Sequence, residues 1–144
     1  MFDTSLAALA AIALAACAAT GGPPGDAPAA GTATLRLGEE ARLGGLLVRA
    51  LRVEEDSRCP ASVQCIHAGT VRLAVRLSRG GTTREAVLRP EAPEPLGDGR
   101  FLWLVAACPS PSRPGPISPA AYSFVVSAAA DITGTPVDHH CAPG

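Results

Sequence analysis

Several features that commonly identify an activity are missing from this sequence of 144 residues. It contains no lysine and only three histidines. It also lacks a Gly-x-Ser-x-Gly elbow, a phosphate-binding glycine loop and a His-Glu-x-x-His pair. A nucleophile beside a positioned base therefore cannot be assembled from these signatures. We predict that the protein is not an enzyme and that it carries no cofactor.

A strong excess of either charge is also absent. The 12 basic residues, all arginine, face 13 aspartates and glutamates. Nucleic acids and anionic lipid headgroups attract proteins through a basic field, which a nearly neutral chain does not supply. We therefore expect no nucleic-acid partner, and nothing in the sequence specifies an oligomeric state.

No apolar run is long enough to span a bilayer. The longest, residues 6–16, is well short of the about 20 residues that a membrane-crossing helix needs. It ends in Leu14-Ala15-Ala16-Cys17, the pattern of a bacterial lipobox, in which a peptidase cuts before the cysteine and lipid is attached to it. The preceding residues lack the usual basic group. We predict that residues 1–16 are a lipoprotein signal peptide; the alternatives are an ordinary secretory signal and a cytoplasmic protein.

A lipid on Cys17 predicts where the protein resides. Each buried methylene contributes about 0.8 kcal/mol, so several acyl chains anchor a protein firmly. Residue 18 is alanine and not aspartate, which favours the outer membrane in an organism that has one. We expect a bacterial cell-envelope protein that contacts the membrane through its N-terminal lipid.

The rest of the chain supports one domain. Without residues 1–16, 128 residues remain, which suffice for a single core. Residues 17–31 hold the lipidated cysteine and a tether rich in glycine, proline and alanine, which has little to bury. We assign residues 32–130 to a β-domain and 131–144 to a C-terminal tail.

Period-two alternation dominates this domain. Its clearest instance places aliphatic residues at every second position: Val71, Leu73, Val75 and Leu77. Arg79-Gly80-Gly81 then supplies a turn into a strand over 82–88. Further strands are expected over 32–37, 46–54 (with a bulge near Arg49-Ala50), 101–107 and 122–127, while five prolines make 109–119 a loop. We predict an all-β fold, an antiparallel β-sandwich or small barrel of about six strands stapled by disulfides.

Four cysteines remain once Cys17 carries lipid. Export exposes them to an oxidising compartment, and four cysteines allow three connectivities. We favour Cys59 with Cys65, because the intervening Pro60-Ala61-Ser62-Val63-Gln64 forms a compact loop between two expected strands. By elimination, Cys108 would then pair with Cys141 and hold the C-terminal tail.

The residues around this loop resemble a known signature. Glu55-Asp56-Ser57-Arg58-Cys59-Pro60, followed by Val63-Gln64-Cys65 and Ala68-Gly69, is similar to that of a family of small uncharacterised bacterial lipoproteins and secreted proteins. The similarity extends more weakly to Ile117, Pro119 and Tyr122. The resemblance implies a β-rich fold and an extracytoplasmic location but no activity. His67 stands where the family usually has tryptophan.

The loop also provides the candidate site residues. Arg58, Gln64 and His67 are candidate contacts for a cell-envelope protein partner, and we expect a non-enzymatic binding or modulator domain, for example an inhibitor of an envelope hydrolase. The alternative is a metal- or redox-handling protein that uses Cys59, Cys65, His67, His139, His140 and Cys141. Oxidised cysteines cannot act as thiolate ligands, so we expect no metal.

The acidic run 54–56 admits two interpretations. Paired carboxylates can perform acid–base chemistry when their environments separate their pKa values. Consecutive acids before a turn are more often a solvated rim, in which Asp56 or Ser57 caps the turn and Arg58 pairs locally. We adopt the second interpretation.

Overall fold

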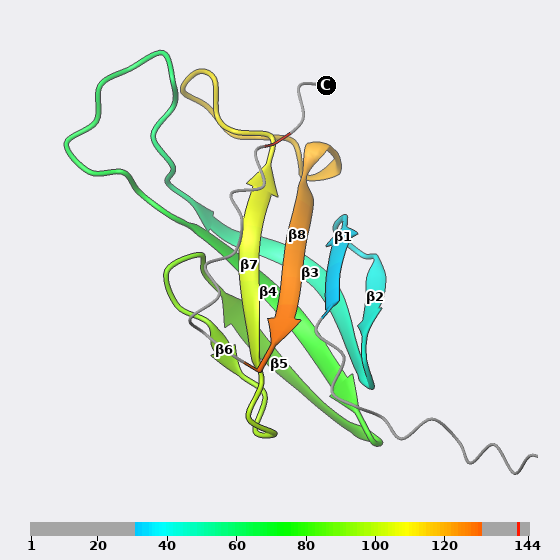
Figure 1. Cartoon of the computed structure of the whole chain (residues 1–144). Helices are drawn as coiled ribbons and strands as arrows, with labels where there is room; N and C mark the ends of the chain where they lie inside the picture. Colours follow the sequence, from blue (N-terminus) through cyan, green and yellow to red (C-terminus); the bar gives the residue numbers. More distant parts are fainter. Residues whose placement is uncertain (1–30, 131–140, 142–144) are drawn as a thin grey trace, which may run out of the picture.

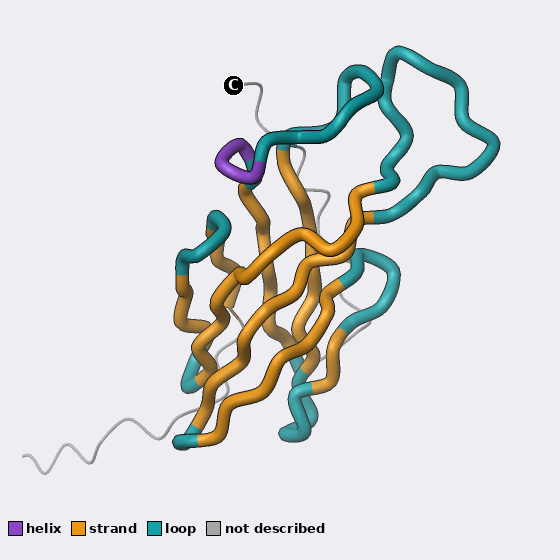
Figure 2. The backbone as a smooth tube through the Cα atoms, turned by 180° about the vertical axis from the view of Figure 1, so that it is seen from behind, coloured by secondary structure: helices purple, strands orange, loops and turns teal. Residues whose placement is uncertain are grey.

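The protein is an antiparallel β-sandwich. A computed structural model describes residues 31–130 and Cys141. Its strands form two four-stranded sheets, in the orders β1-β8-β7-β6 and β2-β3-β4-β5, which lie one in front of the other (Figures 1 and 2). The strands are β1 Gly31–Leu35, β2 Glu40–Leu43, β3 Leu46–Asp56, β4 Val71–Arg79, β5 Thr82–Leu88, β6 Glu94–Pro95, β7 Phe101–Cys108 and β8 Ser123–Ala129.

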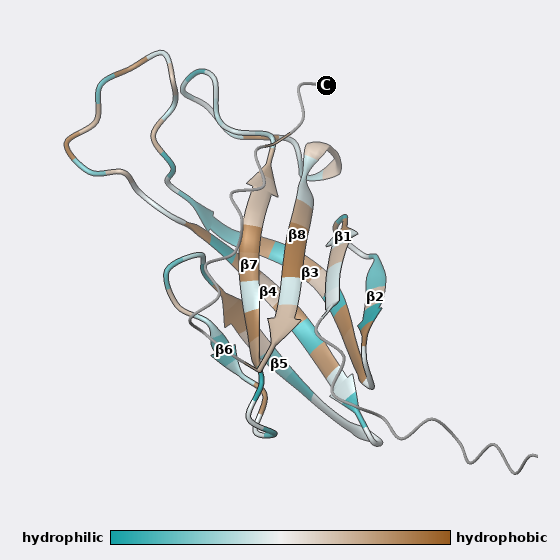
Figure 3. Cartoon of the chain, viewed as in Figure 1, coloured by the Kyte–Doolittle hydropathy of each residue, from teal (hydrophilic) through white to brown (hydrophobic). Residues whose placement is uncertain are grey.

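The core lies between the two sheets and reflects the alternation in the sequence. Successive side chains of a strand point to opposite faces, so every second residue of a half-buried strand is apolar. The predicted inward residues of β4 are all buried, as are Phe124, Val126 and Ala128 of β8. Apolar and polar residues alternate along β4, whereas β8 has a continuous apolar stretch (Figure 3). The sheets are therefore held together by burial of their facing apolar sides.

The predicted fold class and all six predicted strands are confirmed. Gly80 and Gly81, both at positive φ, form the predicted turn between β4 and β5. Of the two architectures considered, the sandwich is the observed one, since each strand pair within residues 31–130 stays in its own sheet. The structure has eight strands rather than the predicted number of about six. The two additional strands are the short β2 and β6. No helix in the described part of the chain is long and apolar enough to cross a membrane.

Bulges shift the alternation in two strands. In β3 the pairing with β4 slips between Ala50 and Arg52, which confirms the predicted bulge, and slips again between Val53 and Glu55. In β7 it slips between Leu104 and Ala106. A bulge places an extra residue in one strand and reverses the facing of the residues beyond it. In β7 the buried positions therefore change from Leu102 and Leu104 to Ala107, while Phe101 and Trp103 are half-buried on the other face.

The two ends of the sandwich differ. At one end, hereafter the loop end, β3 and β7 stop and β4 and β8 start, so that loops 57–70 and 109–122 project together beyond the sheets (Figure 1). The predicted proline-rich loop lies here and is followed by a 3-10 turn, Pro119–Ala121. Gly31, where β1 begins, pairs with Ala128 at the opposite end. The described domain therefore begins at the end farthest from these loops.

Candidate functional site

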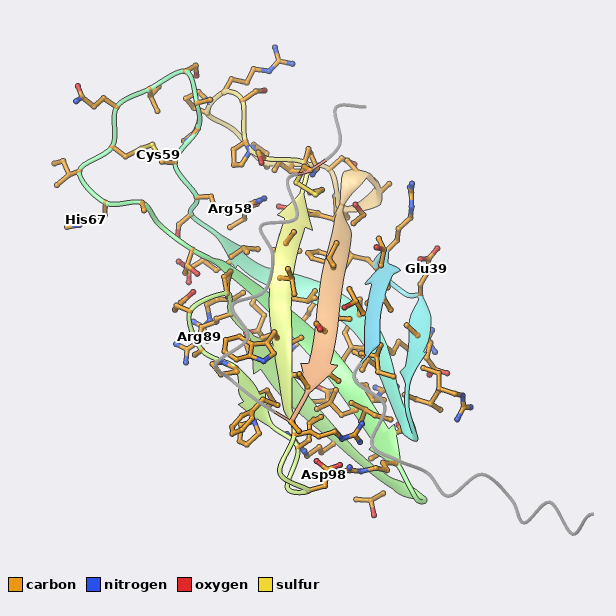
Figure 4. The ribbon with its side chains drawn as sticks, in the orientation of Figure 1. Glu39, Arg58, Cys59, His67, Arg89 and Asp98 are labelled. Atoms are coloured by element: carbon orange, nitrogen blue, oxygen red, sulfur yellow. A yellow bond between two sulfur atoms is a disulfide. The ribbon has the colours of Figure 1, made fainter. Side chains whose placement is uncertain are left out.

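The connection between β3 and β4 is a projecting loop closed by a disulfide. Cys59 and Cys65 are bonded, as predicted, with their Cα atoms 6.0 Å apart. The stem of this disulfide loop (residues 57–70) continues the strand pairing, because Ser57 N donates to Thr70 O at 2.8 Å and Cys59 N to Ala68 O at 2.9 Å. The loop therefore extends the β3–β4 hairpin away from the sandwich, and the disulfide and these backbone hydrogen bonds constrain its conformation (Figure 4).

Gly69 makes the narrow stem possible. Its φ is +69°, a conformation that L side chains rarely adopt, and a Cβ there would lie 1.7 Å from the carbonyl oxygen of Ser57. No side chain fits that space. The glycine of the Ala68-Gly69 motif is therefore required by the close approach of the two backbones.

The tip of the disulfide loop exposes apolar surface. Ile66 is 95% exposed and Val63 43% exposed, and they are the exposed large hydrophobic residues of the described part of the chain. Gln64 and His67, two of the predicted contact residues, are exposed beside them. No Asp, Glu, Lys or Arg occurs in 59–68. The tip is therefore an uncharged, partly apolar surface on a constrained backbone.

Arg58, the third predicted contact residue, is mostly buried. Its side chain is 18% exposed, and it donates to both carboxylate oxygens of Asp56, at 2.8 Å from Nε and 2.6 Å from Nη2. It also donates to the carbonyl oxygens of Ala107 and Pro109 beside the end of β7. The predicted local pairing of Arg58 is confirmed. The guanidinium serves chiefly to join the two sheets at the loop end.

Asp56 does not belong to a solvated rim. Its carboxylate is 11% exposed; besides the bonds from the Arg58 side chain, it accepts hydrogen bonds from Arg58 N at 3.3 Å and from the hydroxyl of Tyr122 at 2.7 Å. Burial raises the pKa of Asp56, but the hydrogen bonds from Arg58 and Tyr122 together hold it below its usual value. Burial and the bond to Asp56 raise the pKa of Tyr122 to about 12. The rim interpretation therefore fails for Asp56, because its partners compensate its burial; Glu54 and Glu55 are exposed.

The proline-rich loop 109–119 has further attachments to its surroundings besides the bond from Arg58 to Pro109 O. Ala61 N of the disulfide loop donates to Pro111 O at 3.0 Å. Cys108, just before the loop, is bonded to Cys141 with a Cα separation of 5.3 Å, which confirms the second predicted pairing. The two loops of the loop end therefore form one connected structure.

A groove of about 700 Å³ lies between β3 and the proline-rich loop. Its walls are formed by residues 37, 51–58, 60, 111, 114–117, 119 and 122. Asp56, Arg58 and Tyr122 are part of this lining, and partly buried Ile117 contributes apolar surface. The sequence did not predict this groove, since its walls come from segments more than 50 residues apart.

The metal-binding alternative gains no support from these residues. Cys59, Cys65, Cys108 and Cys141 all form disulfides, so none offers a thiolate. Within residues 31–130 and Cys141, no three His, Cys, Asp or Glu side chains are grouped to hold a metal ion. His139, His140 and Cys17 lie outside the described residues.

Comparisons with protein-family models, with curated proteins and with solved structures each found no match for this chain.

Proposed function

We propose that this protein is a membrane-anchored, extracytoplasmic binding protein without enzymatic activity, which presents the disulfide loop to a protein partner in the bacterial cell envelope. The observation that carries the proposal is the position of Ile66. A large aliphatic side chain that is 95% exposed stands at the tip of a loop closed by a disulfide and fastened to the sandwich.

The energetics favour such a loop as a contact element. Fully burying an isoleucine side chain contributes about 1.5–3 kcal/mol. A flexible loop would lose part of that gain, because ordering each side chain on binding costs about 0.5–1.5 kcal/mol and ordering the backbone costs more. The Cys59–Cys65 bond and the Gly69 stem reduce this cost before binding. The fitting partner has an apolar recess for Ile66 and needs no opposite charge; the cleft of an envelope hydrolase is one such surface.

The arrangement of the domain supports presentation away from a membrane. A chain anchored at Cys17 enters the domain at Gly31, opposite the loop end (Figure 1). The 14 residues from 17 to 30 span at most about 50 Å when fully extended. A lipid anchor would thus hold the domain within about 50 Å of the bilayer, with the disulfide loop at the end of the domain opposite the point where the chain enters it.

Site-specific photo-crosslinking in the native host tests this proposal. A photoreactive amino acid at position 66 should give a discrete crosslinked species, whereas one at Thr83, exposed on β5, should not. Ile66→Ser, combined with a crosslinker at exposed Gln64, should abolish the species while leaving the melting temperature unchanged. The same species from positions 66 and 83, or its survival in Ile66→Ser, would contradict the proposal.

A further inference from the structure

The geometry of the groove points to a second binding mode, which goes beyond the proposed function and uses a different surface. We infer that the groove receives an extended segment of a partner protein, which adds as a strand to the free edge of β3. The segment carries alternating aliphatic side chains and at least one lysine or arginine.

The free edge arises because β3 is much longer than β2. β3 has 11 residues and β2 has four, and their pairing runs from Leu43 with Leu46 to Glu40 with Arg49. The last backbone bonds on this side are those of Ala50, with Gly38 N at 2.8 Å and Glu39 O at 3.1 Å. Beyond Ala50, residues 51–56 pair with β4 alone among the described strands.

The groove meets this strand along its edge. Two bulges, at 50–52 and 53–55, interrupt the side-chain alternation of β3, so that consecutive residues can face the same side. Here all six consecutive residues 51–56 line the groove. An edge presents unpaired N–H and C=O groups, to which another extended chain can bond. Six residues of strand are about 20 Å long, a usual length for a strand.

The opposite wall leaves these groups available. It is formed by residues 111, 114–117 and 119, four of which are proline, and proline has no N–H to donate. The wall encloses the edge without forming a ladder with it, and Ile117 adds an apolar contact. Aliphatic side chains on one face of an added strand would lie against Ile117 and Val53.

The charges of the lining indicate a basic occupant. Arg58 and Asp56 neutralise each other, and Arg52 lies 3.0 Å from Glu54. Glu55 is 44% exposed; its Oε1 accepts a hydrogen bond of 2.9 Å from Ser57 Oγ, and its Oε2 lies 3.7 Å from Arg72. The lining carries three carboxylates against two guanidinium groups, so a lysine or arginine of the added segment would balance the remaining negative charge.

Neither this chain nor a second copy supplies a suitable segment. Residues 18–30 contain no arginine and no aliphatic residue larger than alanine, and residues 131–140 contain no arginine either. In a second copy the corresponding edge lies inside its own groove, where the proline-rich loop would keep the two edges apart. A separate partner protein is the occupant that fits.

A designed peptide tests the inference. The probe is Ser-Val-Arg-Val-Arg-Val-Ser, added to the mature protein in detergent micelles and followed by anisotropy and by backbone amide NMR shifts. Shifts should concentrate on residues 51–56. Two further versions carry N-methyl groups on all valines or on all arginines. Alternate amides of a strand point to the same side, so the valine amides and the arginine amides of the probe face opposite sides. N-methylation of the set that faces β3 should weaken binding at least about tenfold, whereas N-methylation of the other set should not.

Protein variants separate this site from the loop tip. Glu55→Gln should weaken binding of the probe, whereas Glu85→Gln, exposed on β5, should not; thermal melts confirm that both are folded. Ile66→Ser should bind the probe normally, so failure at one site is distinguishable from failure at the other. Equal affinity of the two N-methylated versions, shifts confined to the disulfide loop, or a dimer of the free protein on size exclusion would overturn the inference.

Discussion

The hydroxyl of Tyr122 donates a 2.7 Å hydrogen bond to Oδ2 of Asp56, and this contact joins the residue before β8 to the last residue of β3. The two strands belong to different sheets, so the bond ties the sandwich together at the loop end. Asp98 and Arg100 form a similar pair at the opposite end, where Asp98 also binds Arg79 of β4. Each end therefore has an Asp-x-Arg pair that joins the sheets.

Loss of the Tyr122 hydroxyl should destabilise the domain moderately. Tyr122→Phe keeps the ring stacked on Phe124 and removes one hydrogen bond to a carboxylate, which costs about 1.5–3 kcal/mol. Asp56→Asn should cost at least as much, since Arg58 then faces an amide. Urea denaturation measures both. Thr82→Val, exposed at the start of β5, is the control, and an equal loss there would show that the effect does not come from the contact with Asp56.

Acid should destabilise the fold through the two aspartates. Hydrogen bonds from Arg100 lower the pKa of Asp98 to about 2, and the pKa of Asp56 is also lowered. A carboxyl group whose pKa is lower in the folded chain stabilises the fold above its unfolded pKa and loses that effect as the pH falls through the folded one. The free energy of unfolding should therefore decrease from about pH 4 to about pH 2.

The acid transition can be assigned by substitution. Asp98→Asn should lower stability at pH 7 and flatten the decrease between these pH values, whereas Glu85→Gln should leave its shape unchanged. Urea denaturation at a series of pH values gives the curves. A parallel displacement of the Asp98→Asn curve at all pH values would contradict the assignment.

Gly69 should tolerate substitution less well than Gly80. Both have positive φ, but a Cβ at Gly69 meets the Ser57 carbonyl, whereas nothing lies within 4 Å at Gly80. Gly80→Ala should cost about 1–2 kcal/mol from backbone conformation alone. Gly69→Ala should cost more and should disturb the amide signals of residues 57–70. Urea midpoints and NMR spectra decide, and equal midpoints would contradict the steric argument.

The two disulfides should stabilise the domain unequally. In the chain-entropy model, the Cys59–Cys65 bond, with a sequence separation of 6, contributes about 2 kcal/mol, and the Cys108–Cys141 bond, with a separation of 33, about 4 kcal/mol. Paired Cys→Ser substitutions with urea denaturation measure each. A larger loss from removing Cys59–Cys65 would show that the loop contributes to the core rather than only to the loop end.

Cys17→Ala should prevent lipidation. The lipobox requires the cysteine thiol, so the variant should accumulate as an uncleaved precursor and should not incorporate a fatty-acid analogue during metabolic labelling. Thr82→Ala, exposed on β5, keeps every cysteine and is the control, which should label like the wild type. Labelling of the Cys17→Ala variant would contradict the proposed anchor.

Periodic patterns within single segments were sufficient to predict the strands that form the core. Val71 to Leu77 alternate because one face of β4 packs on the other sheet, and this alternation can be recognised within the segment alone. β2 and β6, with four and two residues, are too short for a period to be recognised. Both disulfides were also predictable, since four cysteines and one compact loop leave few pairings.

The sequence by itself therefore determined the all-β class, the main strands and the disulfide loop, because each depends on residues close together in the chain. Only the tertiary structure decided that the Asp56 carboxylate is mostly buried and bonded to Tyr122, which is 66 residues away, and that Ile66 is exposed. It also decided the groove, which exists because β3 extends beyond its pairing with β2 and because the proline-rich loop forms the wall opposite this free edge. These features depend on contacts between segments that are far apart in the sequence, and a local sequence pattern does not specify such contacts.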